Sequence, residues 1–261
     1  MARFADNPVR RGAVVTGASS GIGRAAAEAL AAAGHPVVIG ARRIEELEKC
    51  AETIHLAGGE AHVVALDLAD AASIEAFCGA AVEKLGSVEI IVSNAAHNQA
   101  GAVLDMTPED LDQVLTVNVE GTHRLVRGLL PAMVQRRRGD VVFVTSEVVE
   151  RPRPSMAAYV TSKWGLEGYV RALQMELEGS GVRATVLRPG PTMTGMGMDW
   201  DPEVTVEVLT QWQSFGLARH SNFMKPEQVA QGVLAVVEMP RGVHVVTIEL
   251  VPEAPIIEEA P

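Results

Sequence analysis

Short valine-rich runs alternate with longer segments rich in alanine, leucine and glutamate, and this alternation constrains the fold more than any other feature. The apolar runs are Ala13–Val15, Val37–Ile39, His62–Leu66, Val88–Val92, Val141–Val144, Arg183–Leu187 and Val243–Leu250. Helical patterns lie between them at roughly Gly21–Ala33, Ile44–Leu56, Ser73–Leu85, Asn118–Gln135, Ala157–Glu178 and Pro226–Val237. Near-continuous apolar runs are typical of strands buried on both faces. The pattern therefore predicts βαβ units and a seven-stranded, mainly parallel sheet in an α/β, doubly wound arrangement.

The chain is expected to form one domain, residues 1–261, because no repeat, linker or change of composition divides it. Its least regular stretch, residues 190–225, is predicted to form a lid over a substrate site, since long segments between elements are usually functional or disordered. The apolar side chains of this stretch suit an adaptable pocket, although they could also pack the segment onto the core. They belong to Met193, Met196, Met198, Trp200, Trp212, Phe215 and Leu217.

Charge and cysteine content argue against several classes of protein. A formal net charge of −11 disfavours a nucleic-acid partner, which would need a basic face. Cys50 and Cys78 fit neither a disulfide framework nor a zinc site, and the seven histidines show no metal-ligand spacing, so no metal is expected. Neither a signal peptide nor a run of about 18 apolar residues is visible. We therefore expect a cytoplasmic protein with no membrane partner.

A glycine-rich turn follows the first apolar run and precedes the first helical segment. Its sequence is Thr16-Gly17-Ala18-Ser19-Ser20-Gly21-Ile22-Gly23. Glycines let the backbone turn tightly and approach a pyrophosphate, and the amides at the start of the next helix attract negative charge. A glycine-rich turn is often only a turn, but its place after the first strand of an alternating chain favours a dinucleotide site.

The residues after the second apolar run bear on the choice of cofactor. In a dinucleotide-binding fold, an acidic residue near this point binds the ribose 2′-hydroxyl of NAD, whereas the 2′-phosphate of NADP needs positive charge. No carboxylate occurs here before Glu45, so Arg42 is the first candidate for that phosphate and Arg43 the weaker one. The alternative is two surface arginines that open a helix, where cations oppose the helix dipole. The pattern favours NADP(H) over NAD(H).

Tyr159 and Lys163 lie four residues apart in a long helical segment and therefore share one helix face. A free phenol has a pKa near ~10, and a neighbouring ammonium group lowers that pKa toward the range of acid–base catalysis. The pair alone is a weak signal, because many solvated helices carry it. Ser146 follows the fifth apolar run, where ligands bind in a parallel sheet. Its hydroxyl is predicted to bind a carbonyl oxygen, the alternative being a helix cap.

In order and spacing, these motifs resemble the short-chain dehydrogenase/reductase family across essentially the whole chain. The matches are Thr16-Gly17 through Gly23, Asp67-Leu68, Asn94-Ala95-Ala96, Asn118, Ser146, Tyr159 with Lys163, and Pro189-Gly190 followed by Thr194. The resemblance implies a Rossmann-like sandwich and an oxidoreductase that transfers a hydride between NADP(H) and a carbonyl or secondary alcohol substrate.

The resemblance also implies roles for single residues. Tyr159 would exchange the proton, and Lys163 would lower the pKa of the phenol and hold the nicotinamide ribose. Ser146 would orient the substrate oxygen, and Asn118 would support a water in the proton relay. The implied cofactor-binding residues are Gly17, Ser19, Ser20, Gly21, Ile22, Gly23, Arg42, Arg43, Asp67, Leu68, Asn94, Ala95, Ala96, Tyr159, Lys163, Pro189, Gly190, Thr192 and Thr194.

Three departures from the family pattern are visible. Ala96 replaces the usual glycine, and Ser20 stands where some NADP-preferring members carry a basic residue. The segment from Glu147 to Pro154 is more charged and richer in proline than is usual, which weakens any transfer of a relative's substrate to this chain.

Two other functions and an assembly state remain open from the sequence. The chain could be a dinucleotide-sensing protein without turnover, whose signature would be loss of Tyr159 or Lys163, or an NAD(H)-preferring dehydrogenase. The resemblance implies a homo-oligomer, most often a tetramer and otherwise a dimer. The run Val243–Leu250 is predicted as a long last strand at a sheet edge, which invites pairing unless it is covered. Ile256-Ile257 could then reach a neighbouring subunit; the alternative is a monomer with a disordered tail.

Overall fold

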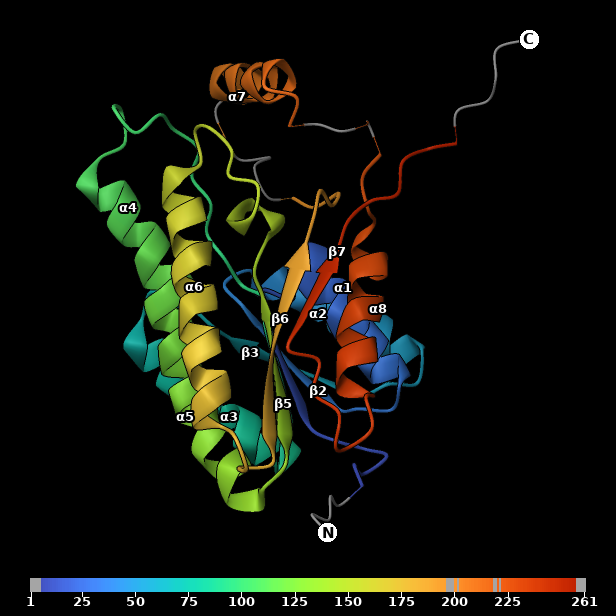
Figure 1. Ribbon diagram of the computed structural model, residues 1–261. Coiled ribbons are helices and arrows are strands. Elements are labelled where there is room, and N and C mark those ends of the chain that lie inside the picture. The colour runs from blue at the N-terminus through green and yellow to red at the C-terminus, as the bar shows by residue number, and fades with distance from the viewer. Residues whose placement is uncertain (1–5, 196–199, 201, 218–219, 221, 257–261) are drawn as a thin grey trace.

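A seven-stranded parallel sheet forms the centre of the molecule, in the order β3-β2-β1-β4-β5-β6-β7 (Figure 1). The computed structural model describes residues 6–195, 200, 202–217, 220 and 222–256. The strands are β1 (Ala13–Thr16), β2 (Val37–Ala41), β3 (Ala61–Ala65), β4 (Ile90–Ser93), β5 (Gly139–Val144), β6 (Val182–Pro189) and β7 (Thr247–Leu250). Every neighbouring pair is parallel, which confirms the predicted doubly wound α/β fold.

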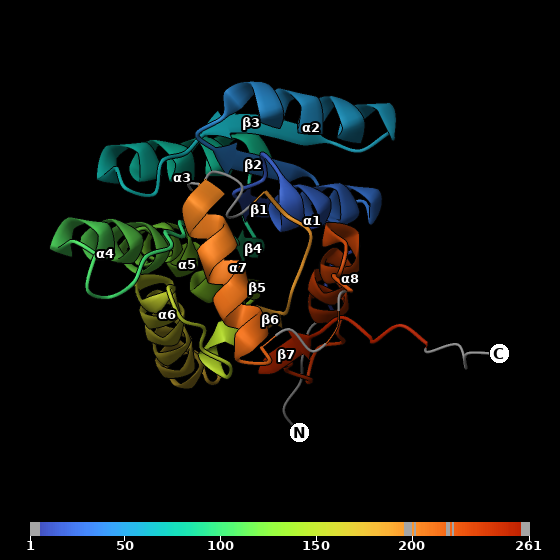
Figure 2. The same ribbon diagram turned by 90° about the horizontal axis from the view of Figure 1, so that it is seen from above.

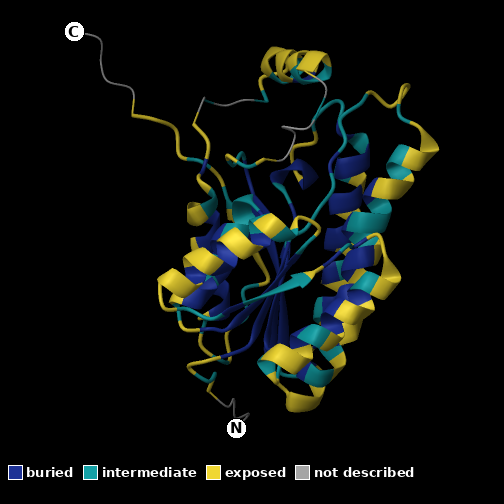
Figure 3. Cartoon of the chain, turned by 180° about the vertical axis from the view of Figure 1, so that it is seen from behind, coloured by how far each residue is buried: buried dark blue, intermediate teal, exposed yellow. Residues whose placement is uncertain are grey.

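Helices cover both faces of the sheet, because successive residues of each buried strand point to opposite sides. Val15 and Ile39 pack with α1, α2 and α8, whereas Val14 and Val38 pack with α3, α5 and α6. These helices are α1 (Gly21–Ala32), α2 (Ile44–Leu56), α3 (Ala71–Leu85), α5 (Thr122–Arg136), α6 (Ala157–Glu176) and α8 (Pro226–Val237). The five inner strands are almost wholly buried, the edge strands β3 and β7 are only partly buried, and the outer helix faces are exposed (Figure 3). No helix in the described ranges is long and apolar enough to cross a membrane.

The last strand is shorter than predicted. Of the run Val243–Leu250, only the second half forms β7, at the sheet edge where it was expected. Residues 243–246 run beside β6, but side chains donate hydrogen bonds to two of their backbone carbonyl groups. Arg183 Nη1 donates to Val243 O at 2.7 Å, and Thr185 Oγ1 donates to Val245 O at 2.6 Å. These bonds replace the regular strand ladder.

Two helices lie where no helix was predicted, α4 (Pro108–Leu115) and α7 (Pro202–Ser214). The second lies within the irregular stretch 190–225, and Figure 2 shows that it crosses above the carboxyl ends of the strands. Each of the two buries a single residue, Val114 in α4 and Val208 in α7. Three residues named above, Met196, Met198 and Ile257, lie outside the described part of the chain.

Candidate active site

The conspicuous motifs of the sequence meet at the carboxyl end of the sheet. The glycine-rich turn joins β1 to α1, Asn94 follows β4, Ser146 follows β5, and Tyr159 lies in the first turn of α6. α7 crosses above this end (Figure 2). Because ligands of parallel α/β proteins bind beyond the carboxyl ends of the strands, this is the candidate site.

The glycine-rich turn forms a cradle that side chains would fill. Gly17 has a φ of 68°, and a Cβ there would lie 2.8 Å from Ala95 Cα. Gly21, at the start of α1, has a φ of 56°, and a Cβ there would lie 3.2 Å from Thr194 Cβ. The side chain of Ile22 packs into the core, so the helix start presents backbone to the cradle. Such a cradle at a helix N-terminus fits the pyrophosphate of a dinucleotide.

Asn94 joins the end of β4 to the end of β1. Its Nδ2 donates to Thr16 O at 3.0 Å, and the backbone amides of Asn94 and Ala95 both donate to Thr16 Oγ1 at 3.0 Å. Ala96 then turns toward the apolar cluster that contains Tyr159. The segment thus fixes the floor of the cradle by hydrogen bonds between strand ends.

A basic side chain from outside the glycine-rich turn lies over it. Arg43 Nη2 donates to Ser19 Oγ at 3.0 Å and to Ser20 Oγ at 2.8 Å. Within the described ranges, the exposed side chain of Arg42 makes no hydrogen bond or ion pair. Arg43 therefore supplies positive charge beside Ser20, the position at which some relatives carry their own basic residue.

The segments that follow β3 and β6 lie at the two ends of the site. After β3, Asp67 Oδ1 accepts a hydrogen bond from Ala69 N at 2.9 Å, and Leu68 is buried. After β6, Gly190 N donates to Leu250 O at 2.7 Å, and Thr192 pairs with Met224 in an isolated bridge. Pro189 ends β6, and Thr194 packs against Gly21, so this segment reaches the cradle.

Asn118 lies in a π-helical segment (Thr116–Gly121) between α4 and α5, and it is buried. Its Oδ1 accepts from His97 N at 2.7 Å, and its Nδ2 donates to His97 O at 2.8 Å and to Ser162 Oγ at 2.9 Å. Ser162 Oγ in turn donates to Tyr159 O at 2.8 Å. Asn118 thus links the loop after β4 to the start of α6, and π-bulges are frequent at functional sites.

Tyr159, Lys163 and Ser146 form the centre of the site. Lys163 Nζ lies 5.5 Å from the centre of the Tyr159 ring and donates to Val144 O at 2.9 Å. Ser146 caps a short 3₁₀ turn (Glu147–Val149), where its Oγ accepts from Val148 N at 3.3 Å. Its hydroxyl also faces the Tyr159 phenol closely enough to lower the pKa of that phenol. Ser146 therefore acts as a cap, the alternative considered for it, and its binding of a carbonyl oxygen stays a prediction.

Burial controls the proton affinities at this centre. It raises the pKa of the Tyr159 phenol to about 12. Ser146 and the charge of Arg153 lower this pKa, but their effects are smaller than that of burial. It also lowers the pKa of the Lys163 ammonium to about 8, against the charge of Glu167, which raises it. Desolvation disfavours both charged forms. The expected lowering of the pKa of Tyr159 is therefore not found, and at neutral pH the tyrosine keeps its proton.

A buried ion pair behind Lys163 was missed in the sequence. Arg188 on β6 donates to both carboxylate oxygens of Glu167, at 2.7 and 2.5 Å, and Thr145 Oγ1 donates to the same carboxylate at 2.9 Å. Both charged side chains are buried. The available signal was the position of Glu167, four residues after Lys163 on the same helix face.

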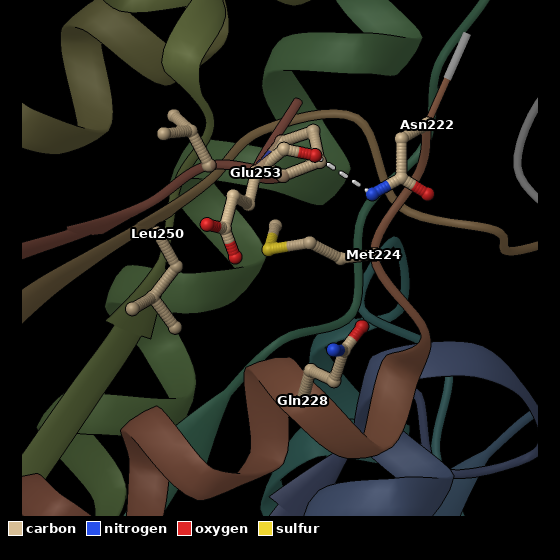
Figure 4. A pocket seen from close by; sticks show the side chains of 7 residues that line it. Asn222, Met224, Gln228, Leu250 and Glu253 are labelled. Atoms are coloured by element: carbon tan, nitrogen blue, oxygen red, sulfur yellow. Dashed lines mark hydrogen bonds between the residues drawn. The ribbon is translucent and has the colours of Figure 1, made fainter. Parts of the chain in front are cut away.

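Two hollows open near this end of the molecule. One, of about 250 Å³, lies between residues 99–110, Ser155 with Ala158, and α7. The other, of about 310 Å³, lies beside β7, where Asn222 Nδ2 donates to Glu253 O at 2.9 Å (Figure 4). The first is lined by Ala158, which precedes Tyr159 in the chain. Among the described residues, no three His, Cys, Asp or Glu side chains are grouped to bind a metal.

A doubly wound parallel sheet with a glycine-rich turn before its first helix is the architecture of dinucleotide-binding proteins. The family model for short chain dehydrogenases matches residues 11–205. The chain belongs to this family, whose members are oxidoreductases that use an NAD(P) dinucleotide.

Three curated relatives are 32–37% identical to the chain over the aligned residues. A putative ketoacyl reductase of the monensin polyketide synthase from Streptomyces virginiae is 36% identical over 84% of this chain and 87% of its own. Glycine betaine reductase ATRR from Emericella nidulans is 32% identical over 88% of this chain, which spans 18% of that protein. A short chain dehydrogenase from Pseudocercospora fijiensis is 37% identical over 75% of this chain and 64% of its own.

Solved structures show the same fold with bound dinucleotides. An alcohol dehydrogenase from the archaeon Thermococcus sibiricus, complexed with 5-hydroxy-NADP, has a TM-score of 0.79 and 30% identity over 92% of this chain and 96% of its own. A 3-ketoacyl-(acyl-carrier-protein) reductase from Brucella melitensis, complexed with NADH, has a TM-score of 0.78 and 28% identity over the same shares. Relatives of this fold thus take either dinucleotide.

Proposed function

We propose that the protein is an NADP(H)-dependent reductase of a carbonyl substrate, with Tyr159 as the general acid. The observation that carries this proposal is the buried Tyr159 with Ser146 and Lys163 beside it, next to a backbone cradle. When bound there, the dinucleotide supplies the hydride. Ser146 orients the substrate oxygen, and Tyr159 donates its proton to that oxygen.

The proton affinity of Tyr159 favours reduction near neutral pH. Because burial holds its pKa at about 12, the phenol carries its proton at pH 7 and is ready to donate it. The reverse reaction needs the phenolate, so alcohol oxidation should be favoured as the pH rises. Asn118 is fixed between the loop after β4 and the backbone of the first turn of α6, and we expect it to support a water that replaces this proton.

The position of Arg43 supports NADP(H) as the cofactor. Its guanidinium is held over the glycine-rich turn by two serine hydroxyls, where it can meet a phosphate on the adenosine ribose. Asp67 and Leu68 would border the adenine, and residues 189–194 would hold the carboxamide. The NAD(H)-preferring alternative is supported only by the NADH bound to one relative.

Arg43→Ala is expected to weaken NADPH binding by about tenfold or more and to leave NADH binding little changed, since a charged hydrogen bond is worth about 1.5–3 kcal/mol. Fluorescence titration with both cofactors measures the effect. Arg42→Ala is the matched control, and its effect should be the smaller, because the Arg42 side chain is not held over the turn. An equal loss for both cofactors in Arg43→Ala would show that Arg43 does not bind the 2′-phosphate.

One experiment tests both the substrate class and the alternative of a dinucleotide-sensing protein without turnover. NADPH oxidation should be followed with ketones, 3-oxoacyl thioesters, terpenoid ketones and steroid ketones. The hollow of about 250 Å³ beside Ala158 and α7 supports a substrate position there, with residues 190–225 as its lid in a single-domain protein. Tight binding of NADPH with oxidation by none of these classes would favour a dinucleotide sensor. The cytoplasmic location stays a prediction.

Light scattering at micromolar concentration is expected to show a homo-oligomer, a tetramer or a dimer. The exposed edge at β7 supports this, because Val246 and Val251 beside it are 51% and 42% exposed, and Ile256 is 92% exposed. A two-fold related subunit would cover such a surface. A single species near the chain mass of 27.7 kDa would contradict the assembly.

A further inference from the structure

The charged loop between the 3₁₀ turn and α6 closes on a buried carboxylate. Glu147 is 4% exposed and pairs with both Arg153 and Arg151. The Arg153 side chain is only 14% exposed, against 46% for Arg151, so Arg153 is the inner partner. Ser155 in the same loop has a φ of 60°, a conformation that surrounding contacts must hold in place.

Trp212 of α7 covers this loop. The Arg153 guanidinium lies 4.8 Å from the centre of the Trp212 ring, and Trp212 Nε1 donates to Pro154 O at 3.2 Å. Ser155 Oγ donates to Gln211 Oε1 at 3.3 Å. Trp212 also packs against the apolar cluster that contains Tyr159. α7 is otherwise mostly exposed (Figure 3), so these contacts dock it on the site.

Few charged groups surround the Tyr159 phenol in the described structure. Lys163 lies on the same helix, and Arg153 and its partner Glu147 lie on the segment after β5. Of these, Arg153 lowers the pKa of Tyr159. Glu147 is shared between Arg151 and Arg153, so the three side chains carry a net positive charge, and Trp212 lies against both Arg153 and the cluster of Tyr159.

We propose that Arg153 is a positioning residue that stabilises the phenolate form of Tyr159, and that Trp212 strengthens its effect by keeping water from the guanidinium. A charge acts more strongly where water is excluded. Docking of α7 over a substrate would then also favour proton transfer at Tyr159. The inference rests on the proposed role of Tyr159 but concerns its ionisation, which can be measured without turnover.

The test uses the presence of only two tyrosines in the chain, Tyr159 and Tyr169. In a Tyr169→Phe background, incorporation of 3,5-difluorotyrosine labels Tyr159 alone. Fluorination also lowers the pKa of the phenol, so that its titration midpoint lies in a pH range in which the protein stays folded. The ¹⁹F chemical shift then follows the ionisation. Arg153→Gln is expected to raise the titration midpoint by about one unit, which corresponds to a tenfold loss of phenolate below the midpoint.

A second variant removes the buried carboxylate that Arg153→Gln would leave unpaired. Glu147→Gln with Arg153→Gln replaces both charges by neutral partners and should raise the midpoint in the same direction. An unchanged midpoint in this double variant, with circular dichroism and NADPH binding like those of the parent, would overturn the proposal. The shift of Arg153→Gln would then arise from the unpaired Glu147.

The role of Trp212 is tested by its dependence on Arg153. Trp212→Leu should raise the midpoint by less than Arg153→Gln does, and should add nothing in the Arg153→Gln background. An equal shift in both backgrounds would show that Trp212 acts directly on Tyr159 and not through the arginine. In kinetic assays of alcohol oxidation, the pKa seen in the pH profile of kcat/KM should rise with the same variants. A lid residue with a purely structural role would change KM without changing this pKa.

Discussion

Replacement of Tyr159 by phenylalanine is expected to lower kcat by ~10²–10⁴-fold and to leave the Kd for NADPH nearly unchanged. The substitution removes only the ionisable oxygen, while the ring keeps its packing against Val148, Met156 and Trp212. Stopped-flow or steady-state assays give kcat, and fluorescence titration gives the Kd. The two readouts together separate a chemical defect from a failure to bind the dinucleotide.

Tyr169→Phe is the matched control for this experiment. Tyr169 lies on the same helix but contacts Phe143 and His123, away from the site. It should retain the activity of the parent. If Tyr159→Phe kept more than about a tenth of the parent turnover, Tyr159 would have no part in proton transfer, since general acid–base catalysis contributes far more than that.

Arg188→Ala is expected to lower the free energy of unfolding by about 3–5 kcal/mol, because it leaves a buried charge without its partner. Glu167 is 2% exposed, and among the described residues it would keep Thr145 and the more distant Arg171, at 3.9 Å, as polar contacts. Urea unfolding measured by circular dichroism gives the change. Such a loss is a large part of the ~5–15 kcal/mol that stabilises a typical domain.

Two further variants keep this prediction testable if Arg188→Ala does not fold. Arg188→Lys retains the charge but not the bidentate contact, so it should lower the free energy of unfolding by less. Arg188→Met with Glu167→Leu removes both charges and should recover much of the stability, as replacement of buried pairs by apolar groups often does. A loss below 1 kcal/mol in Arg188→Ala would mean that the pair contributes little to the fold.

The parallel sheet and the site at its end could be predicted because their signals are local. The inner strands contain apolar runs, and each helix packed on the sheet carries an apolar face. α4 and α7 lack such a face, since each buries one residue, and α7 contains Val204, Thr205 and Val206, whose branched side chains do not favour a helix. α4 did carry a signal in its capping box of Thr107 and Asp110.

The finer features of the site depend on tertiary contacts that no spacing reveals. The sequence placed Arg42 and Arg43 side by side, but only the fold shows which one reaches Ser19 and Ser20. It showed Lys163 beside Tyr159 but not how completely both are buried, and burial sets the direction of their pKa values. The partners Glu167 and Arg188 come from different elements and meet only in the folded chain.

Transfer of deuterium from the cofactor tests the central claim most directly. The protein should be incubated with NADPH carrying deuterium at nicotinamide C4, on each face in turn, and with the carbonyl compound that supports NADPH oxidation. The account predicts that mass spectrometry of the product alcohol shows one deuterium on the former carbonyl carbon with one of the two cofactors, and that Tyr159→Phe abolishes the product. Product without deuterium from either cofactor, or NADPH binding with no reduced product from any carbonyl class, would contradict it.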